Sequence, residues 1–239
     1  MTDSYNQEIA GKETDSTTTW ILLQIADSAF PTGGFSHSFG FESATKHGFV
    51  TEYSAFKAFL FSCLQNTASF SLSFVNESHK NCHDVERIKE LDGMVQAYLS
   101  NHVANRASIR QGNSLLDTAC KTFGKQEMKN LQVQLENKCL FGHFAVVFGF
   151  MCGMLNLSVV QTQQLFLFST LRTVIASAVR LGNIGPLQAQ SLQFEMQKTA
   201  EEIRKKFEMT TVEEATTTAP VADFLQGAHD NLFSKLFYS

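Results

Sequence analysis

The chain carries apolar side chains at helical spacing along most of its length. Trp20, Leu23, Ala26 and Phe30 form the first stripe, with intervals that place them on one face of a helix. Stripes of this kind recur as far as residue 207, and no alternating run bounded by turn residues marks a strand. The pattern predicts an all-α fold, with one helical-bundle domain over residues 20–209 and roughly eight to ten helices joined by short loops.

Glycine, proline and polar stretches predict where these helices end. The run Pro31-Thr32-Gly33-Gly34 stops the first helix, because proline disfavours a helical residue before it and glycine permits left-handed turns. A second helix is expected to begin near Ser36, a candidate N-cap, and to end at Gly48. The remaining breaks are expected at a polar stretch and at glycines: residues 76–84, Gly124 and residues 182–186.

The most apolar run, residues 144–157, is shorter than the roughly 18 residues that a membrane span requires. A helix over residues 143–157 is apolar nearly all round, which predicts a core helix at the centre of the fold rather than a membrane helix. The Gly149-x3-Gly153 spacing within it would let a neighbouring helix approach closely.

The two ends of the chain differ from this core. Residues 1–19 are polar and rich in Ser, Thr, Asp and Glu, which predicts a disordered tail. Residues 210–220 are expected to form a tether of Thr, Ala and Glu with nothing to bury. Residues 221–239 repeat apolar side chains at helical spacing, which predicts an amphipathic helix on a flexible tether. Two positions are open to that helix, one on its own core and one in the groove of a partner.

Composition restricts the class of partner. The 239 residues have a net charge of −4, so no basic field attracts nucleic acid or an anionic membrane, and proteins are the expected partners. The five cysteines are scattered and form no C-x-x-C pair, which argues against a disulfide framework and favours a reducing compartment. The N-terminal sequence lacks the marks of a signal or transit peptide, so a cytoplasmic location is expected.

Residues that could carry chemistry are few. The nearest match to a G-x-S-x-G nucleophile turn, residues 34–38, ends in serine and follows a predicted helix, which argues against catalysis by Ser36. Neither phosphate-binding glycine loop occurs, so no cofactor is expected and no catalytic residue is assigned. His79, Cys82 and His83 are weak candidate ligands for nickel or zinc, and solvated side chains in a polar loop are the alternative interpretation.

Five motifs, taken in order, resemble those of one family. Residues 22–42 contain P-T-G-G-F-S-H-S-F-G-F-E and resemble the signature of the UreF urease accessory proteins, a leucine-rich helix followed by P-x-G-G-F-S-x-S-x-G-x-E. Phe39 and Pro186-Leu187 are more similar to eukaryotic members, and the resemblance extends over residues 20–239. The other similar segments are R-A-S-I-R-Q-G (106–112), H-F-A-V-V-F-G (143–149), S-A-V-R-L-G-N-I-G-P-L (177–187) and F-S-K-L-F-Y-S (233–239).

The resemblance implies an all-α homodimer without enzyme activity of its own. Such proteins bind UreD (also called UreH), and the complex recruits the GTPase UreG and docks on apo-urease for nickel insertion. The resemblance leaves open whether UreG is stimulated, by an arginine that reaches its nucleotide, or restrained until nickel is passed on. The alternative function is a direct nickel-binding metallochaperone that uses the His/Cys cluster.

The same resemblance supplies candidate partner-binding residues. The connector at Gly33 and Gly34 would turn sharply, and Ser36 and Ser38 would cap the next helix. Four arginines are candidates for carboxylate or phosphate recognition, with structural salt bridges as the alternative: Arg106, Arg110, Arg172 and Arg180. The apolar stripe of the C-terminal tail is the candidate contact with UreD/UreH. The candidates are Gly33, Gly34, Ser36, Ser38, Glu42, Arg106, Arg110, Arg180, Phe224, Leu225, Leu232, Phe233, Leu236 and Phe237.

Overall fold

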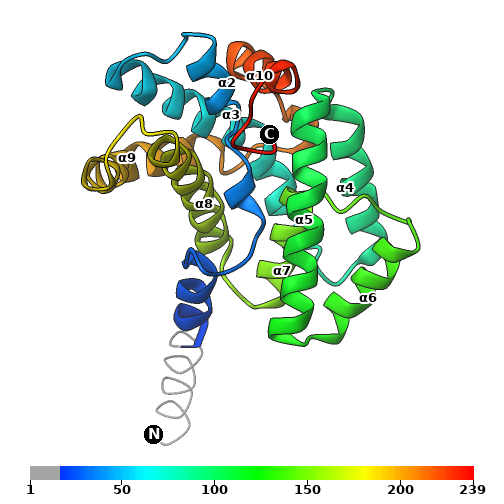
Figure 1. Ribbon diagram of the computed structural model, residues 1–239. Coiled ribbons are helices and arrows are strands. Elements are labelled where there is room, and N and C mark those ends of the chain that lie inside the picture. Colours follow the sequence, from blue (N-terminus) through cyan, green and yellow to red (C-terminus); the bar gives the residue numbers. More distant parts are fainter. Residues whose placement is uncertain (1–16) are drawn as a thin grey trace, which may run out of the picture.

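A computed structural model describes residues 17–239, and within that range the fold is all-α, without a strand (Figure 1). The predicted fold class is confirmed. Residues 17–26 are helical. The helices that follow are α2 (Phe41–Lys46), α3 (Tyr53–Lys80), α4 (Val85–Tyr98), α5 (His102–Phe123), α6 (Gln126–Glu136), α7 (Phe144–Met154), α8 (Val159–Arg180), α9 (Pro186–Phe207) and α10 (Pro220–Gly227). Short 3-10 turns cover Gly34–Ser36, Val212–Glu214 and Ala228–Asn231.

The core is centred on α3, which packs against α7, α8 and α9, while α5 covers another side of α7. The predicted close approach of a neighbour to α7 is confirmed. A Cβ atom added at Gly149 would lie 2.1 Å from the Ser78 hydroxyl and 2.2 Å from the Val75 carbonyl oxygen, and one at Gly153 would lie 2.6 Å from the His79 carbonyl oxygen. Only glycine lets the backbones of α3 and α7 come this close.

Among the described residues, α3 is the one helix that is long and apolar enough to cross a membrane, judged by length and composition alone. Buried core helices share that property, and Leu60, Leu64 and Leu72 of α3 are fully buried inside the protein. Helix α7 is also buried, as predicted, and is too short for such a span.

Two predicted helix boundaries are wrong. Helix α3 continues to Lys80 instead of ending before residue 76, because polar side chains of the additional turn are engaged within the fold: Ser78 is buried, and the Asn76 side-chain amide donates to the Glu208 carbonyl oxygen at 3.0 Å. Helix α2 begins at Phe41 and has Gly40, not Ser36, at its N-cap. Phe39 and Gly40 both have left-handed backbone angles, with φ of 54° and 79°, so the helix begins only after them.

The first predicted apolar stripe is also partly wrong. Trp20 and Leu23 are 71% and 54% exposed, whereas Ile25 is buried and Ile21 and Leu22 pack against the core. With two adjacent apolar faces on one helix, spacing alone did not identify the buried face. The disordered tail predicted for residues 1–19 lies mostly outside the described residues, but residues 17–19 are helical.

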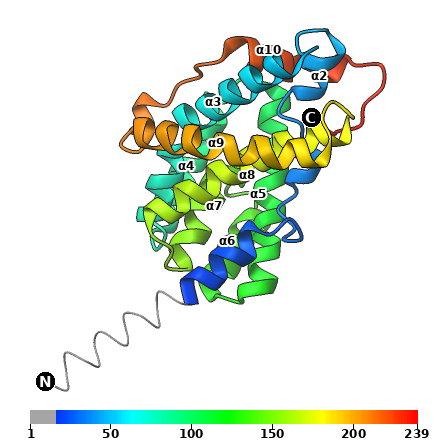
Figure 2. The same cartoon turned by 90° about the vertical axis from the view of Figure 1, so that its left-hand side faces the viewer.

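The segment before α10 is bound along α3 and is not a free tether. Val212 is buried in the core. The Ser69 hydroxyl donates to the Thr216 carbonyl oxygen at 2.9 Å, and the Asn66 side-chain oxygen accepts from the Thr218 amide at 2.8 Å. Helix α10 then packs against α2, α5 and α3, so the C-terminal segment folds back on its own core (Figure 2).

Candidate functional site at the C-terminal junction

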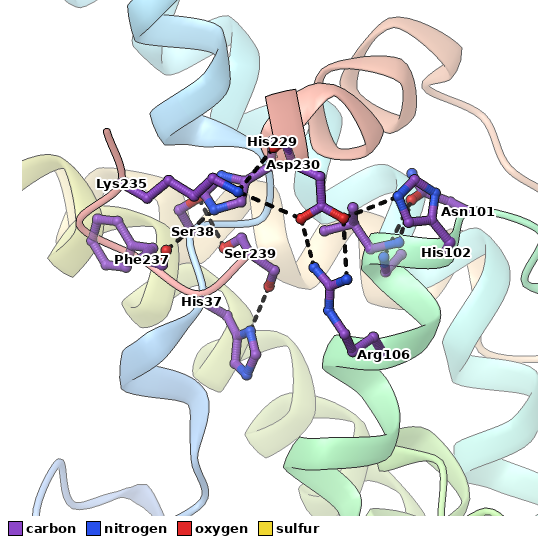
Figure 3. A network of polar contacts seen from close by, with 12 residues as sticks. His37, Ser38, Asn101, His102, Arg106, His229, Asp230, Lys235, Phe237 and Ser239 are labelled. Atoms are coloured by element: carbon purple, nitrogen blue, oxygen red, sulfur yellow. Dashed lines mark hydrogen bonds and ion pairs between the residues drawn. The ribbon is translucent and has the colours of Figure 1, made fainter. Parts of the chain in front are cut away.

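The last residues of the chain pass between the glycine-rich connector that precedes α2 and helices α5 and α8. We call this place the C-terminal junction (Figure 3). The Ser239 carbonyl oxygen accepts from the Ser38 amide at 2.6 Å and from the Ser38 hydroxyl at 3.1 Å. The Tyr238 amide donates to the Ser36 carbonyl oxygen at 2.8 Å. Motifs from opposite ends of the sequence therefore share three hydrogen bonds, two of them between main-chain atoms.

Glu42 fixes the chain just before this contact. Its carboxylate is buried and accepts from the amides of Leu236 at 2.7 Å and Phe237 at 3.0 Å, while Lys46 lies 3.1 Å away. Burial acts to raise the pKa of Glu42, but the two amide hydrogen bonds and Lys46 outweigh it and lower that pKa. The carboxylate therefore stays charged and holds residues 236 and 237 against α2.

Arg106 and Asp230 form a bidentate ion pair that joins α5 to the turn after α10. The two guanidinium-to-carboxylate distances are 3.1 Å and 2.8 Å, and His102 and Lys235 lie 3.2 Å and 3.7 Å from the same carboxylate (Figure 3). The hydrogen bonds and charge of Arg106, aided by a hydrogen bond from His102 and the charge of Lys235, lower the pKa of Asp230 to about 2. Two interpretations were open for Arg106, recognition of a partner's carboxylate or phosphate and a structural salt bridge. In the structure Arg106 forms a salt bridge within the chain.

Two further candidate arginines, Arg110 and Arg180, stack on aromatic rings. The Arg110 guanidinium lies 3.6 Å from the centre of the Tyr238 ring. Arg180 lies 3.7 Å from the ring centre of Phe35 and 4.3 Å from that of Phe237, and it donates to the Phe35 carbonyl oxygen. Such contacts are worth about 0.5–2 kcal/mol each. They connect α5, α8 and the connector to the same C-terminal residues.

Two buried histidines complete the junction. His37 Nδ1 lies 2.5 Å from the Ser239 hydroxyl, and burial, aided by Arg110 and Arg106, lowers the pKa of His37 to about 4. His229 Nε2 lies 3.2 Å from the Phe237 carbonyl oxygen, and burial lowers the pKa of His229. Both rings are therefore neutral at pH 7 in the folded protein. Sequence analysis did not select either histidine, because each one pairs with residues that no local pattern relates to it.

The predicted apolar anchors of the C-terminal tail divide into two sets. Leu225 and Phe237 are buried in the protein, and Leu232 is half-buried. Phe224 is 70% exposed, and Phe233 is fully exposed. Leu236 is also exposed, as is Phe35 of the connector. The exposed set therefore places the rings of Phe224 and Phe233 in solvent, on a backbone that the hydrogen bonds to Glu42 and the Arg106–Asp230 ion pair fix in position.

The local geometry predicted for the connector residues, a sharp turn at the glycines and a helix cap at the serines, is confirmed only in part. Gly33 has a φ of 75°, and an added Cβ would contact Ser114 on α5 at 3.4 Å. Gly34 passes equally close to Thr173 on α8. The Ser36 hydroxyl bonds within its own turn, to the Gly33 carbonyl oxygen at 3.0 Å, and does not cap α2. The Ser38 hydroxyl does accept from the first turn of α2, at 3.4 Å from the Glu42 amide.

The motifs at residues 106–112 and 143–149 meet at a second contact. The Ser108 hydroxyl lies 3.1 Å from His143 Nδ1 and accepts from the Phe144 amide at 3.2 Å. A Cβ at Gly112 would lie 2.0 Å from the Gly142 carbonyl oxygen, so glycine is required there. These residues shape the packing of α5 on α7.

A buried carboxylate that sequence analysis missed supports this contact. Asp92 of α4 accepts from the amides of Phe141, Gly142 and His143, at 2.5, 3.1 and 2.7 Å. It satisfies main-chain donors that lead into α7. Its position within an amphipathic helix gave no signal, because one carboxylate there resembles any solvated residue.

The candidate metal ligands do not form a site. His79 lies in the last turn of α3, with Nε2 2.8 Å from the Leu157 carbonyl oxygen, and Cys82 is buried, whereas His83 is exposed. No group of three His, Cys, Asp or Glu side chains within residues 17–239 is placed to hold a metal ion. The predicted polar loop is in part a helix, which separates these side chains.

Comparison with known proteins agrees with the motifs. The profile of the UreF family matches residues 50–197. The chain belongs to the UreF family. It is 39% identical to urease accessory protein F of Oryza sativa subsp. indica over 220 residues, which cover 91% of this chain and 84% of the rice protein. The Arabidopsis thaliana protein of that name is 35% identical over 243 residues, with 100% of both chains covered.

Bacterial relatives are more distant. The urease accessory protein UreF of Trichodesmium erythraeum (strain IMS101) is 27% identical over 221 residues, which cover 90% of this chain and 94% of that protein. The role of this UreF-family chain is thus that of a urease accessory protein. The higher identity to the plant proteins agrees with the eukaryotic character of Phe39 and Pro186-Leu187.

Proposed function

We propose that this chain is a non-catalytic scaffold of urease maturation. The outer face of its C-terminal segment binds UreD/UreH, and the resulting complex recruits UreG and docks on apo-urease, where nickel is inserted. One observation carries the proposal: family motifs from three other parts of the sequence close on the C-terminal segment, while Phe224 and Phe233 remain in solvent.

The physical argument rests on preorganisation. Large aromatic side chains in solvent are suitable anchors for a protein partner, since aromatic residues dominate the binding energy of many interfaces. Ordering a free tail on binding would cost conformational entropy for each residue immobilised. Here Glu42 and the Arg106–Asp230 pair already fix the backbone between Phe224 and Leu236, which reduces that cost.

For UreG, the geometry favours a positioning role over an arginine finger. Arg106 is engaged with Asp230, and Arg180 packs against two phenyl rings and bonds to the Phe35 carbonyl oxygen, so neither guanidinium is free to extend into a partner's nucleotide site. The exposed Phe35 ring, stacked on Arg180 beside Gly34, is the proposed contact. On this proposal UreG is held in place, and the nickel ion is cargo of the complex.

A homodimer in the cytoplasm is part of the same proposal. The chain from Gly182 to Phe194 contains no charged residue, and Leu187 and Phe194 of α9 are 85% and 77% exposed. An uncharged face can meet its own copy across a two-fold axis without repulsion. The five free cysteines support a reducing location.

Co-purification with UreD/UreH tests the proposal. Phe224→Ser and Phe233→Ser should each reduce the yield of complex while leaving the helical circular dichroism unchanged, because both side chains lie in solvent. Met209→Ser is the matched control, since Met209 is 85% exposed but outside the segment. Point variants are better than deletion after Pro220, which would also remove the partners of Glu42 and His37. Full binding by a variant that carries both Phe224→Ser and Phe233→Ser would refute the proposed contact.

A further inference from the structure

A pocket of about 210 Å³ lies between the chain that leads into α2 and one face of α8. It is separate from the outward face of the C-terminal segment. Its wall on the helix consists of residues at intervals of three and four, and the small side chain of Ala176 leaves room in the middle. The lining residues are Ser28, Phe30, Pro31, Thr32, Gly33, Gly34, Phe35, Arg172, Thr173, Ala176, Ser177 and Arg180.

The charges around this pocket are unbalanced. Two arginines line it and no acidic residue does. Arg172 is half-buried and donates to the Ala26 carbonyl oxygen, and Arg180 donates to the Phe35 carbonyl oxygen. Neither guanidinium forms an ion pair with any carboxylate in residues 17–239. Two cations that bond only to neutral oxygens leave positive charge in the pocket.

The nearest acidic groups are already engaged. Asp27 attracts Arg172 at a distance, but its carboxylate accepts from the Ala29 amide at 2.8 Å. Glu42 attracts Arg180, but it is occupied by two amides and Lys46. Burial lowers the pKa of both Arg172 and Arg180 and outweighs these attractions, so the carboxylates only partly replace the solvation that each cation loses. An external anion would replace it.

Two hydroxyl groups, those of Ser28 and Thr32, extend the set of donors in the same pocket. The hydroxyls of Thr173 and Ser177 also lie on its wall, but they donate to carbonyl oxygens of their own helix at 2.8 and 2.9 Å. The Arg180 guanidinium packs against the rings of Phe35 and Phe237 and donates to the Phe35 carbonyl oxygen, so its position is restrained. A planar guanidinium matches the two oxygens of a phosphate, sulfate or carboxylate.

We propose that this pocket binds a small oxyanion, held by Arg172 and Arg180. Its volume is below the ~300 Å³ of the smallest usual sites for drug-sized ligands, so a single oxyanion group fits better than a nucleotide. The oxyanion is either free, as inorganic phosphate, or the carboxylate of an acidic side chain. The site does not depend on the proposed UreD/UreH contact, and the isolated chain is sufficient to test it.

The test is a thermal-unfolding titration of the full chain with sodium phosphate and, separately, sodium acetate, with sodium chloride keeping the ionic strength constant. Phosphate should raise the Tm of the wild type above its value in chloride. Arg172→Gln should weaken the apparent Kd for phosphate by about tenfold or more, because it removes charge-assisted hydrogen bonds. Arg87→Gln is the control, since Arg87 is paired with Glu90 and lies outside the pocket.

A second variant guards against a loosened fold in Arg172→Gln. Ala176→Glu places a negative charge in the pocket and should abolish the phosphate effect while leaving the Arg172 hydrogen bond in place. Stabilisation by phosphate alone indicates a free tetrahedral anion, and equal stabilisation by acetate indicates a receptor for carboxylates. A wild type that phosphate and acetate stabilise no more than chloride, or variants that respond as strongly as the wild type, would overturn the proposal.

Discussion

Acidification should weaken the C-terminal junction through His37. This ring is buried 2.5 Å from the Ser239 hydroxyl, and its pKa is lowered to about 4 from 6.5. Burial is the main cause, and the positive charges of Arg110 and Arg106 add to it. A proton on the folded protein would therefore be placed among cations in a site that excludes water.

The sign and size follow from linkage. Because the folded-state pKa lies below the unfolded one, the contribution to stability is complete above pH 6.5 and is lost as the pH falls towards 4. At pH 5 the unfolded chain is mostly protonated at this site and the folded chain mostly is not, so the loss is roughly 2 kcal/mol relative to neutral pH. Below pH 4 it reaches about 3.4 kcal/mol.

Urea unfolding at a series of pH values measures this loss. His37→Gln should remove about 2 kcal/mol of the decline in unfolding free energy between pH 7 and pH 5, since glutamine keeps a hydrogen-bonding group beside Ser239 but does not titrate. Other titrating groups contribute equally to both proteins and cancel in the difference. His47→Gln, at an exposed histidine, controls for the loss of one imidazole. Parallel pH profiles for the wild type and His37→Gln would refute the reasoning.

Two further predictions concern the frame around the junction. Gly149→Ala should lower the unfolding free energy, measured with urea, by about 3 kcal/mol or more, because its Cβ would lie 2.1 Å from the Ser78 hydroxyl. The control Gly93→Ala has no atom within 4 Å of its Cβ and should raise the unfolding free energy by about 0.5–1 kcal/mol. Equal effects would contradict the proposed contact of α3 and α7. Glu42→Ala should lower the unfolding free energy by about 3 kcal/mol in the same assay, because two amides lose a charged acceptor. Lys46→Ala should lower it by less than about 1 kcal/mol. Equal losses would show that the ion pair, and not the amide bonds, carries the effect.

Most of the helices could be predicted from the sequence because the buried face of a helix repeats apolar residues every three or four positions. Helix α8 and helix α9 meet at the break predicted for residues 182–186, and Pro186 occupies the first turn of α9. Periodicity failed where a helix carries more than one apolar face. Trp20 and Leu23 continue a regular stripe, yet they lie in solvent.

The junction could be predicted only through the family motifs. Spacing gave no reason to connect Ser38 with Ser239, which are 201 residues apart, or Arg106 with Asp230. Polar pairing of this kind depends on the tertiary fold. The motifs identified the right segments but not the partners, and His37, Asp230 and Tyr238 were missed because each lies between or beside the residues that the motifs select.

The most direct test of the central claim is hydrogen–deuterium exchange on the full chain, alone and with UreD/UreH bound. Bound partner should slow exchange at residues 220–239 and at the connector over residues 33–42, while α6, remote from the junction in the fold, should exchange unchanged (Figure 1). Protection confined to other helices, with residues 220–239 unaffected, would contradict the account.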